Sequence, residues 1–438
     1  MVDKVISRLT ITVMAACLFG SAIIGFAQEE AAAEGDAAEQ APAQPEGPQW
    51  KDREEYDAYQ AAYGATDPAE KLKALEAWKE KYPETDYEVQ RRLMYLDAYQ
   101  GLQQPAELYD AALELVGMGR DTLGDPNYLR GAYLITTLTM SMQRTEAQYL
   151  ANGEKYAREV LEIANGMQRP AEMAEAAWTT QIQGIKVSAQ TTVGWIAMQR
   201  KNYPVAEREL RTLLEMDPQN GQASYWLGTV LLAQRDPQKQ FQAFWQFARA
   251  GHMTGEGAMP AANRKTVADY LADIYTKFHG DDSGLDELIQ QAQQRTFSPQ
   301  GFSVKSAEQI AVEKENELLR TNPDLYAWRN TKNELTGPDG MQFYQTRMND
   351  SLVSLVGYVI SQDPPERPTT LVLGLSDRTT REVTLHLDQP YRYPAARGTR
   401  LRFQAVPTSF TQEPFMLVMD AEQDNISGWP DAPPRTEE

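Results

Sequence analysis

Cysteine is almost absent from this sequence, and histidine is rare. Cys17 is the one cysteine, and His252, His279 and His386 lie far apart along the chain. A chain that has lost its first 27 residues can therefore form no disulfide, thiolate zinc site, iron–sulfur cluster or cysteine nucleophile. No histidine has a second one at helical spacing, so an HExxH-type metal pair is excluded. We expect neither a metal nor a cofactor.

Phosphate-binding and nucleophile motifs are also missing. No GxSxG elbow, GxxxxGK[ST] loop or GxGxxG strand-turn-helix is present. Asp and Glu outnumber Lys and Arg by 62 to 42, and the net charge of -20 makes a surface that repels phosphates. The sequence therefore predicts a protein that does not bind nucleic acid and that acts by binding rather than as an enzyme.

The first 27 residues are arranged like a secretory signal peptide. Lys4 and Arg8 precede an apolar run, and the small residues Gly25 and Ala27 stand at its exit. Two alternatives remain open. The run is nearly long enough to span a bilayer as an uncleaved tether, and the residues around Cys17 loosely resemble a lipoprotein cleavage box. In each case we expect export to the periplasm or cell envelope of a bacterium.

Two segments are too polar to form a core of their own. Residues 28–49 contain six acidic residues, no Lys or Arg, and almost nothing large and apolar. Such a composition predicts a disordered acidic linker. Residues 421–438 are likewise expected to form a disordered tail.

Residues 50–296 show apolar residues at helical spacing, interrupted by turn signals. Proline follows a polar or aromatic residue at each interruption, a position that suits the first turn of a helix because no internal donor is lost there. No convincing strand pattern occurs in this stretch. These signals are Asp67-Pro68, Tyr82-Pro83, Gln104-Pro105, Asp125-Pro126, Arg169-Pro170, Asp217-Pro218 and Asp236-Pro237.

A period of 34 residues separates Gly194 from Gly228, and each glycine follows an apolar residue. Ala206 and Leu210 then fall at the small and large apolar positions of a second helix. This pattern resembles the tetratricopeptide repeat, most closely in residues 187–220 and more weakly in residues 221–254. The resemblance implies helical hairpins that together bind a protein partner. Extra residues before 187 imply an elongated helix from about Ala171, and hence an irregular array.

From residue 350 the apolar period changes from 3.6 to 2. Five runs within residues 350–420 predict strands, and their succession looks like an OB-fold, a small five-stranded antiparallel barrel. The segment between the third and fourth runs is too short for the helix that this fold usually carries there. Residues 297–349 are expected to form a connector that is helical on both sides of Asn322-Pro323. The expected fold class is mainly α, an irregular helical-hairpin array followed by this barrel.

The tetratricopeptide resemblance implies which residues contact a partner. By resemblance, five places of each first helix face the groove, and none of them is basic here, which excludes a clamp for the terminal carboxylate of an acidic peptide. A neutral groove suits an apolar or amphipathic segment, unless the elongated helix makes the aromatic residues part of the core. The expected partner-binding residues are Trp195, Gln199, Gln222, Tyr225 and Thr229.

The barrel offers a second candidate surface. Four arginines lie between Tyr391 and Arg402, with Tyr391 and Tyr393 interleaved, as expected for a surface that binds an anion or a glycan of the cell wall. The alternative is an edge strand whose arginines prevent sheet-to-sheet association. The residues concerned are Tyr391, Arg392, Tyr393, Arg400 and Arg402.

One acidic loop, residues 279–287, could suggest a metal site. Its glycine stands at the wrong place for a calcium loop. A capping box with Ser283 as N-cap and Asp286 three residues later explains the acids more simply. An interaction scaffold of the bacterial envelope is thus the expected function, with a glycan-binding module as the alternative.

Overall fold

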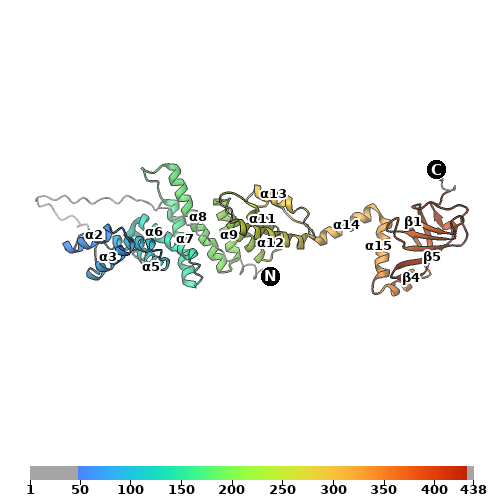
Figure 1. Cartoon of the computed structure of the whole chain (residues 1–438), viewed down its shortest axis with the longest axis horizontal. Helices are drawn as coiled ribbons and strands as arrows, with labels where there is room; N and C mark the ends of the chain where they lie inside the picture. The colour runs from blue at the N-terminus through green and yellow to red at the C-terminus, as the bar shows by residue number, and fades with distance from the viewer. Residues whose placement is uncertain (1–47, 432–438) are drawn as a thin grey trace. The chain divides into compact units, whose positions relative to one another are not determined.

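The computed structural model describes residues 48–431 and divides the chain into two compact units, one up to Val304 and one from Lys305 (Figure 1). The signal-like segment, nearly all of the acidic linker and the last seven residues lie outside the described range. Within residues 48–431, no helix is both long and apolar enough to cross a membrane.

The first unit consists of helices that pack in sequence order as antiparallel hairpins. Its elements are α2 (Arg53–Gly64), α3 (Pro68–Lys81), α4 (Glu88–Gly101), α5 (Pro105–Val116), α6 (Arg120–Ser141), α7 (Ala147–Gly166), α8 (Glu175–Gln199), α9 (Tyr203–Met216), α10 (Gly221–Ala233), α11 (Pro237–His252), α12 (Ala261–His279) and α13 (Leu285–Gln294). From α2 to α11, the even-numbered helices are the first helices of the hairpins and the odd-numbered ones the second. α12 and α13 both pack on α11. The expected helical-hairpin array is confirmed.

Proline and aspartate set several helix starts. Asp67 accepts hydrogen bonds of 3.0 Å from the backbone N–H groups of Ala69 and Glu70, and Pro68 opens α3. Asp236 likewise accepts 2.9 Å from Gln238 N at the start of α11. An N-cap side chain of this kind satisfies donors that the first turn leaves unpaired.

Four hairpin turns contain a residue in the same backbone conformation. Gln103, Gln143, Lys201 and Arg235 each have a φ between 52 and 56°, the left-handed conformation that reverses the chain after a helix. Lys201 and Arg235 are 34 residues apart, so the period seen in the sequence is the spacing of two successive turns. The expected elongated helix is α8, which has 25 residues against 13 in α10 and projects beyond its neighbours in Figure 1.

The two glycines of the 34-residue period allow close packing inside their hairpins. A Cβ atom added at Gly194 would lie 3.0 Å from Leu210 Cδ2, and one added at Gly228 would lie 2.9 Å from Phe247 Cε1. Ala206 and Leu210 are fully buried. Each first helix therefore contacts its second helix at a point where an added side chain would crowd its neighbour.

The second unit joins three helices to a closed barrel. The barrel strands follow the order β1-β2-β3-β5-β4, and β1 also pairs with β4. The expected five-stranded barrel is confirmed, but β3 and β5 run parallel, so the barrel is mixed and not wholly antiparallel. Its elements are α14 (Ala307–Thr321), α15 (Pro323–Thr336), α16 (Gly340–Phe343), β1 (Val353–Asp363), β2 (Thr370–Gly374), β3 (Val383–Leu387), β4 (Arg400–Gln412), β5 (Phe415–Ala421) and β6 (Ile426–Ser427).

Segments on both sides of residues 350–420 complete the barrel core. Trp328 of α15 is 1% exposed and meets the ring of Phe415 edge-on at 5.9 Å. Leu335 is fully buried in the same cluster. After the fifth strand, β6 pairs with Arg402 and Phe403 of β4. Most of the connector therefore belongs to the barrel unit, and the stretch from 421 to 431, which we expected to be disordered, carries a strand.

Candidate functional site

The structure places the two expected aromatic anchors of the helical array in its core. Trp195 is 4% exposed and Tyr225 7% exposed. The ring of Phe247 lies 6.2 Å from that of Tyr225. Gln199 is exposed and Thr229 half-buried. The polar members of the set thus reach the surface, whereas the aromatic pair packs between the helices.

The first helices of three successive hairpins share a feature that surrounds these polar residues. In α6, α8 and α10, the stretches 131–143, 187–199 and 221–234 contain no Asp, Glu, Lys or Arg, although the chain is 24% charged. We call the solvent-accessible residues of these stretches the uncharged strip. Its half-buried or exposed members are Tyr133, Leu134, Thr137, Met140, Ser141, Met142, Gln143, Val187, Ser188, Thr191, Met198, Gln199, Gln222, Thr229, Leu232, Ala233 and Gln234.

Three threonine hydroxyls of the strip already donate hydrogen bonds to backbone carbonyls. Thr137, Thr191 and Thr229 donate to the carbonyl four residues earlier in their own helices, at 2.9, 2.7 and 2.9 Å. Such bonds satisfy the hydroxyl within its own helix. A ligand therefore meets methyl groups, short aliphatic chains and amides, which favour an apolar or amphipathic partner over a charged one.

The second helices carry the charges instead. On α9, Glu207 forms an ion pair of 3.0 Å with Arg211 of the same helix and one of 2.6 Å with Lys239 of α11. The second pair links α9 to α11. Glu209 accepts a hydrogen bond of 2.9 Å from Gln190 of α8 and one of 2.8 Å from Arg208. Burial disfavours the charged form of both carboxylates, but these donors outweigh it and hold both pKa values below the ordinary range. Ion pairs thus link neighbouring hairpins and leave the strip neutral.

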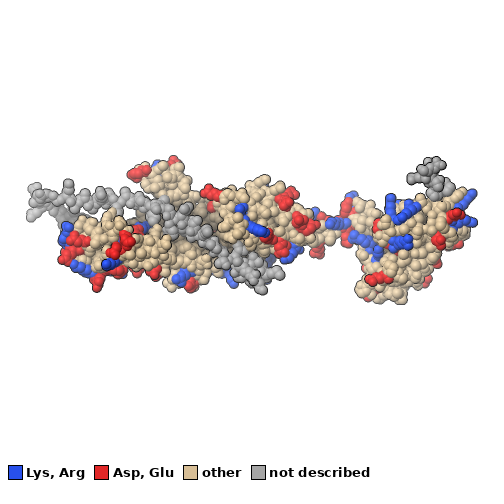
Figure 2. Space-filling view, viewed as in Figure 1, with Lys and Arg blue, Asp and Glu red and all other residues tan. Residues whose placement is uncertain are grey.

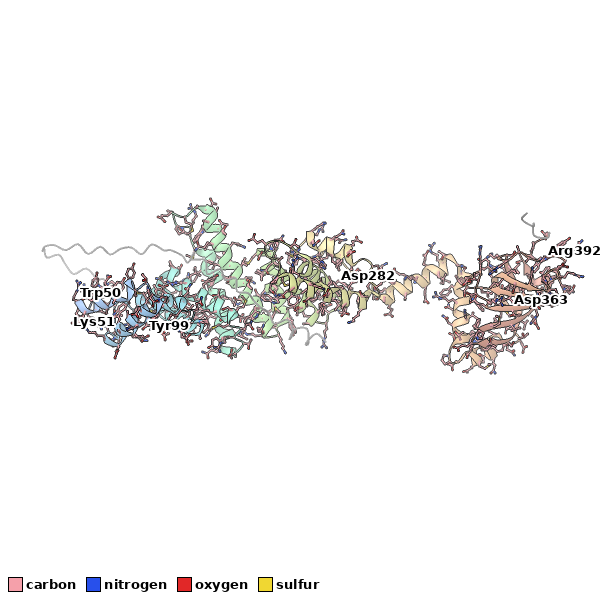
Figure 3. The ribbon with its side chains drawn as sticks, in the orientation of Figure 1. Trp50, Lys51, Tyr99, Asp282, Asp363 and Arg392 are labelled. Atoms are coloured by element: carbon pink, nitrogen blue, oxygen red, sulfur yellow. The ribbon has the colours of Figure 1, made fainter. Side chains whose placement is uncertain are left out.

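On the barrel, the tyrosine expected to lead the anion or glycan surface is a core residue. Tyr391 is 8% exposed, its ring stacks on Trp429 at 3.8 Å and 6°, and its hydroxyl donates 3.0 Å to Gln423 O. Burial and two nearby aspartates raise the pKa of Tyr391 to about 12. Its neighbour Arg392 is exposed at the periphery of the unit (Figure 3). Tyr393 is half-buried, so it is the only tyrosine of the predicted pair with an accessible ring.

Arg400 and Arg402 are exposed but engaged. Both guanidinium groups contact Oδ2 of Asp324 in the first turn of α15, at 3.2 and 3.0 Å. The five residues therefore do not form one surface. Arg400 and Arg402 both contact Asp324 of α15, whereas the ring of Tyr391 stacks on Trp429 in the core. Because β4 pairs with β1, β5 and β6, the arginines do not mark a free sheet edge.

The acidic loop after α12 brings together serine, histidine and aspartate. His279 Nε2 lies 3.0 Å from Ser283 Oγ and 3.6 Å from Asp281 Oδ1, and the Ser283 hydroxyl also contacts Asp281. In a catalytic triad the hydroxyl and the carboxylate engage opposite ring nitrogens. Here both approach Nε2, so the arrangement differs from that of a catalytic triad.

The capping box predicted in that loop is wrong. α13 begins at Leu285 behind Gly284, which has a φ of 81°, and no side chain caps the helix. Asp281 instead accepts 3.0 Å from Ser283 N and closes the turn before it. Across residues 48–431, no group of three or more His, Cys, Asp or Glu side chains is arranged to hold a metal ion.

Sequence reasoning missed Glu382. The strand alternation predicts an outward side chain, yet Glu382 is fully buried. Its carboxylate accepts four hydrogen bonds. They come from Lys332 Nζ at 2.7 Å, from Leu375 N at 2.8 Å, and from Ser376 N and Ser376 Oγ at 2.6 Å each. No local signal could have revealed it, because the lysine lies on α15, 50 residues earlier. This carboxylate attaches α15 to the barrel.

Comparison with known proteins yields no match, either to a family model or to a curated protein. Its function is therefore inferred from the geometry and charge of the described residues.

Proposed function

We propose that the protein is a non-enzymatic interaction scaffold whose uncharged strip binds an apolar or amphipathic segment of a partner protein. The observation that carries the proposal is the absence of charged residues from the stretches 131–143, 187–199 and 221–234, which belong to three successive first helices, in a chain of net charge -20. Core packing requires apolar residues on one face of a helix only, and the solvent side is normally charged. In these stretches the solvent-facing side of the helix also lacks charge. This indicates a surface that a partner covers when the protein functions.

The resemblance to tetratricopeptide repeats supports the same proposal. Helical hairpins stacked in sequence order present one helix of each pair as an extended surface. Gln199, Gln222 and Thr229 are the members of the expected binding set that remain accessible. We propose that they contact the partner, and that Trp195 and Tyr225 fix the helices beneath them.

Location in the bacterial envelope is part of the proposal. It rests on the basic, apolar and small residues of the first 27 positions, in the order of an export signal. N-terminal sequencing of the protein from fractionated cells tests it. A first residue near Gln28 outside the cytoplasm agrees with cleavage, and a start at Met1 in the membrane fraction indicates the uncleaved tether.

Matched threonine variants test the strip. Thr229 on α10 and Thr212 on α9 both donate to the carbonyl four residues earlier, at 2.9 and 3.2 Å, but only Thr229 lies in the strip. The full chain and its Thr229→Lys and Thr212→Lys variants are used to capture proteins from envelope extract. We expect Thr229→Lys to lose the partner and Thr212→Lys to retain it, because a charge must be desolvated only in the covered surface.

Muramidase treatment of the extract separates the alternatives. Capture that survives glycan digestion and depends on Thr229 supports the scaffold. Capture that disappears with the glycan and is unaffected by Thr229→Lys assigns binding to the glycan-binding module instead. Equal loss in both lysine variants contradicts the assignment to the strip.

A further inference from the structure

Where β1 and β4 pair, their outward-facing residues include two arginines and no acid. Residues facing outward pair across the two strands as Tyr358 with Arg400 and Val356 with Arg402. The next outward pair is Ser354 and Gln404. Figure 2 shows several basic side chains on the visible face of this unit. This surface is thus locally basic in a chain that is strongly acidic overall.

A third arginine flanks the same surface. Arg378, from the loop between β2 and β3, holds its guanidinium carbon 5.0 Å from the centre of the Tyr358 ring. Tyr358 is the cross-strand neighbour of Arg400, so Arg378 packs on the residue next to that arginine. Within residues 48–431, Arg378 forms no ion pair.

One carboxylate oxygen already occupies the point where two of these arginines converge. Oδ2 of Asp324 lies 3.2 Å from Arg400 Nη2 and 3.0 Å from Arg402 Nη2. The Asp324 side chain is 35% exposed, and those of the two arginines 56 and 54%. An oxyanion from solution can therefore reach the position that Asp324 Oδ2 marks.

We propose that Arg378, Arg400 and Arg402 form a binding site for a phosphate group with two or more negative charges, and that Asp324 competes for it. Three guanidinium groups against one carboxylate leave two positive charges at the site. A singly charged carboxylate balances only one of them, whereas a phosphomonoester or pyrophosphate offers several oxygens and charge to match. This site is independent of the uncharged strip.

Phosphate binding at this site would weaken the attachment of α15 to the barrel. Asp324 stands in the first turn of that helix, and its bonds to β4 hold this end of α15 on the barrel. A phosphate that takes both guanidinium groups releases Asp324, so the ligand and the docked end of α15 compete for the same donors. By linkage, loosening of α15 tightens phosphate binding.

Titration of the full chain with pyrophosphate at low ionic strength tests the site. We expect Arg402→Gln to weaken binding at least about tenfold, as expected for loss of one charge-assisted hydrogen bond. Arg397→Gln is the matched control: it removes the same charge from an exposed arginine of the turn before β4 that is not one of the three proposed ligands, and it should leave the affinity unchanged. Asp324→Ala should tighten binding, because it removes the competitor.

Vesicles identify the source of the phosphate. Binding to vesicles that contain phosphatidic acid, lost in Arg402→Gln and retained in Arg397→Gln, assigns a lipid phosphomonoester. Saturable binding of pyrophosphate without vesicle binding assigns a soluble ligand. The proposal is overturned if neither probe binds, if both arginine variants lose affinity equally, or if Asp324→Ala weakens binding while circular dichroism shows an intact fold.

Discussion

Lys332 of α15 donates a hydrogen bond of 2.7 Å to Oε1 of Glu382, a fully buried carboxylate immediately before β3. The lysine is the only cationic partner of Glu382 within residues 48–431, and the remaining donors come from Leu375 and Ser376. A helix that precedes the barrel in sequence is thus fixed to the barrel by one buried ion pair.

Removal of the lysine should destabilise the second unit. We expect Lys332→Met to lower its free energy of unfolding by about 3 kcal/mol, because a buried carboxylate is left without its cation. Denaturant unfolding of the full chain, followed by hydrogen exchange of β3 amides, measures the loss. Lys314→Met, on the exposed surface of α14, should change little. Equal effects of the two substitutions would contradict a structural role for the pair.

Acid should have a related effect. Burial opposes ionisation of Glu382, but hydrogen bonds from Lys332, Ser376 and the backbone outweigh it and hold its pKa below the ordinary 4.5. The ionised form therefore stabilises the fold fully above about pH 4.5, and this stabilisation is lost as the pH falls through the lower, folded-state pKa. Unfolding midpoints of the second unit, measured between about pH 6 and 3, should fall steeply in the wild type and less steeply in Lys332→Met.

Two glycines in helices should respond to alanine in opposite directions. Gly228→Ala places a Cβ atom 2.9 Å from Phe247 Cε1 and should cost about 1 to 3 kcal/mol through overpacking. A Cβ atom at Gly184 of α8 meets nothing within 4 Å, so Gly184→Ala should stabilise by about 0.5 to 1 kcal/mol through helix propensity. Thermal melts of both variants decide this. A stable Gly228→Ala protein would show that α10 and α11 are not closely packed.

Truncation of the buried tryptophan should affect stability before it affects binding. Trp195→Ala should cost about 3 to 5 kcal/mol, since the side chain lies in the core of the helical unit. Gln199→Ala, exposed one turn later, should change the melting temperature little. Unaltered melting of Trp195→Ala would place its ring in the binding surface instead.

The barrel should need its N-terminal helices. Residues 305–431 include Trp328, Leu335 and Trp429, and should give a cooperative thermal transition when expressed alone. Residues 350–420 by themselves expose the core against which these side chains pack, and should not melt cooperatively. Circular dichroism of the two fragments separates these outcomes.

Local pattern predicted the elements of this protein well, for physical reasons. Alternation at Leu401, Phe403 and Ala405 puts fully buried side chains on one face of β4, because successive residues of a strand point to opposite sides. Proline after a capping aspartate predicted the starts of α3 and α11, where both residues satisfy the first turn.

Contacts between distant segments could not be predicted from local pattern. Tyr391 has the local signature of a surface residue, and only Trp429, from a stretch that we expected to be disordered, shows why it is buried. The arginines of β4 meet Asp324 more than 70 residues away. The parallel pairing of β3 with β5 also depends on closure of the whole barrel, which no single strand specifies.

Packing of the helical unit in sequence order has a kinetic consequence. Each of its helices except α13, which packs on α11, finds its main contacts in a helix adjacent to it in the chain, so little loop-closure entropy opposes their formation. Closure of the barrel joins β1 to β4, and its core also needs Trp328 from before the first strand. Chains with local contacts fold in microseconds to milliseconds, and those with distant strand pairings fold more slowly. During synthesis the hairpins can thus form one after another, while the second unit must wait until its last strands have been made.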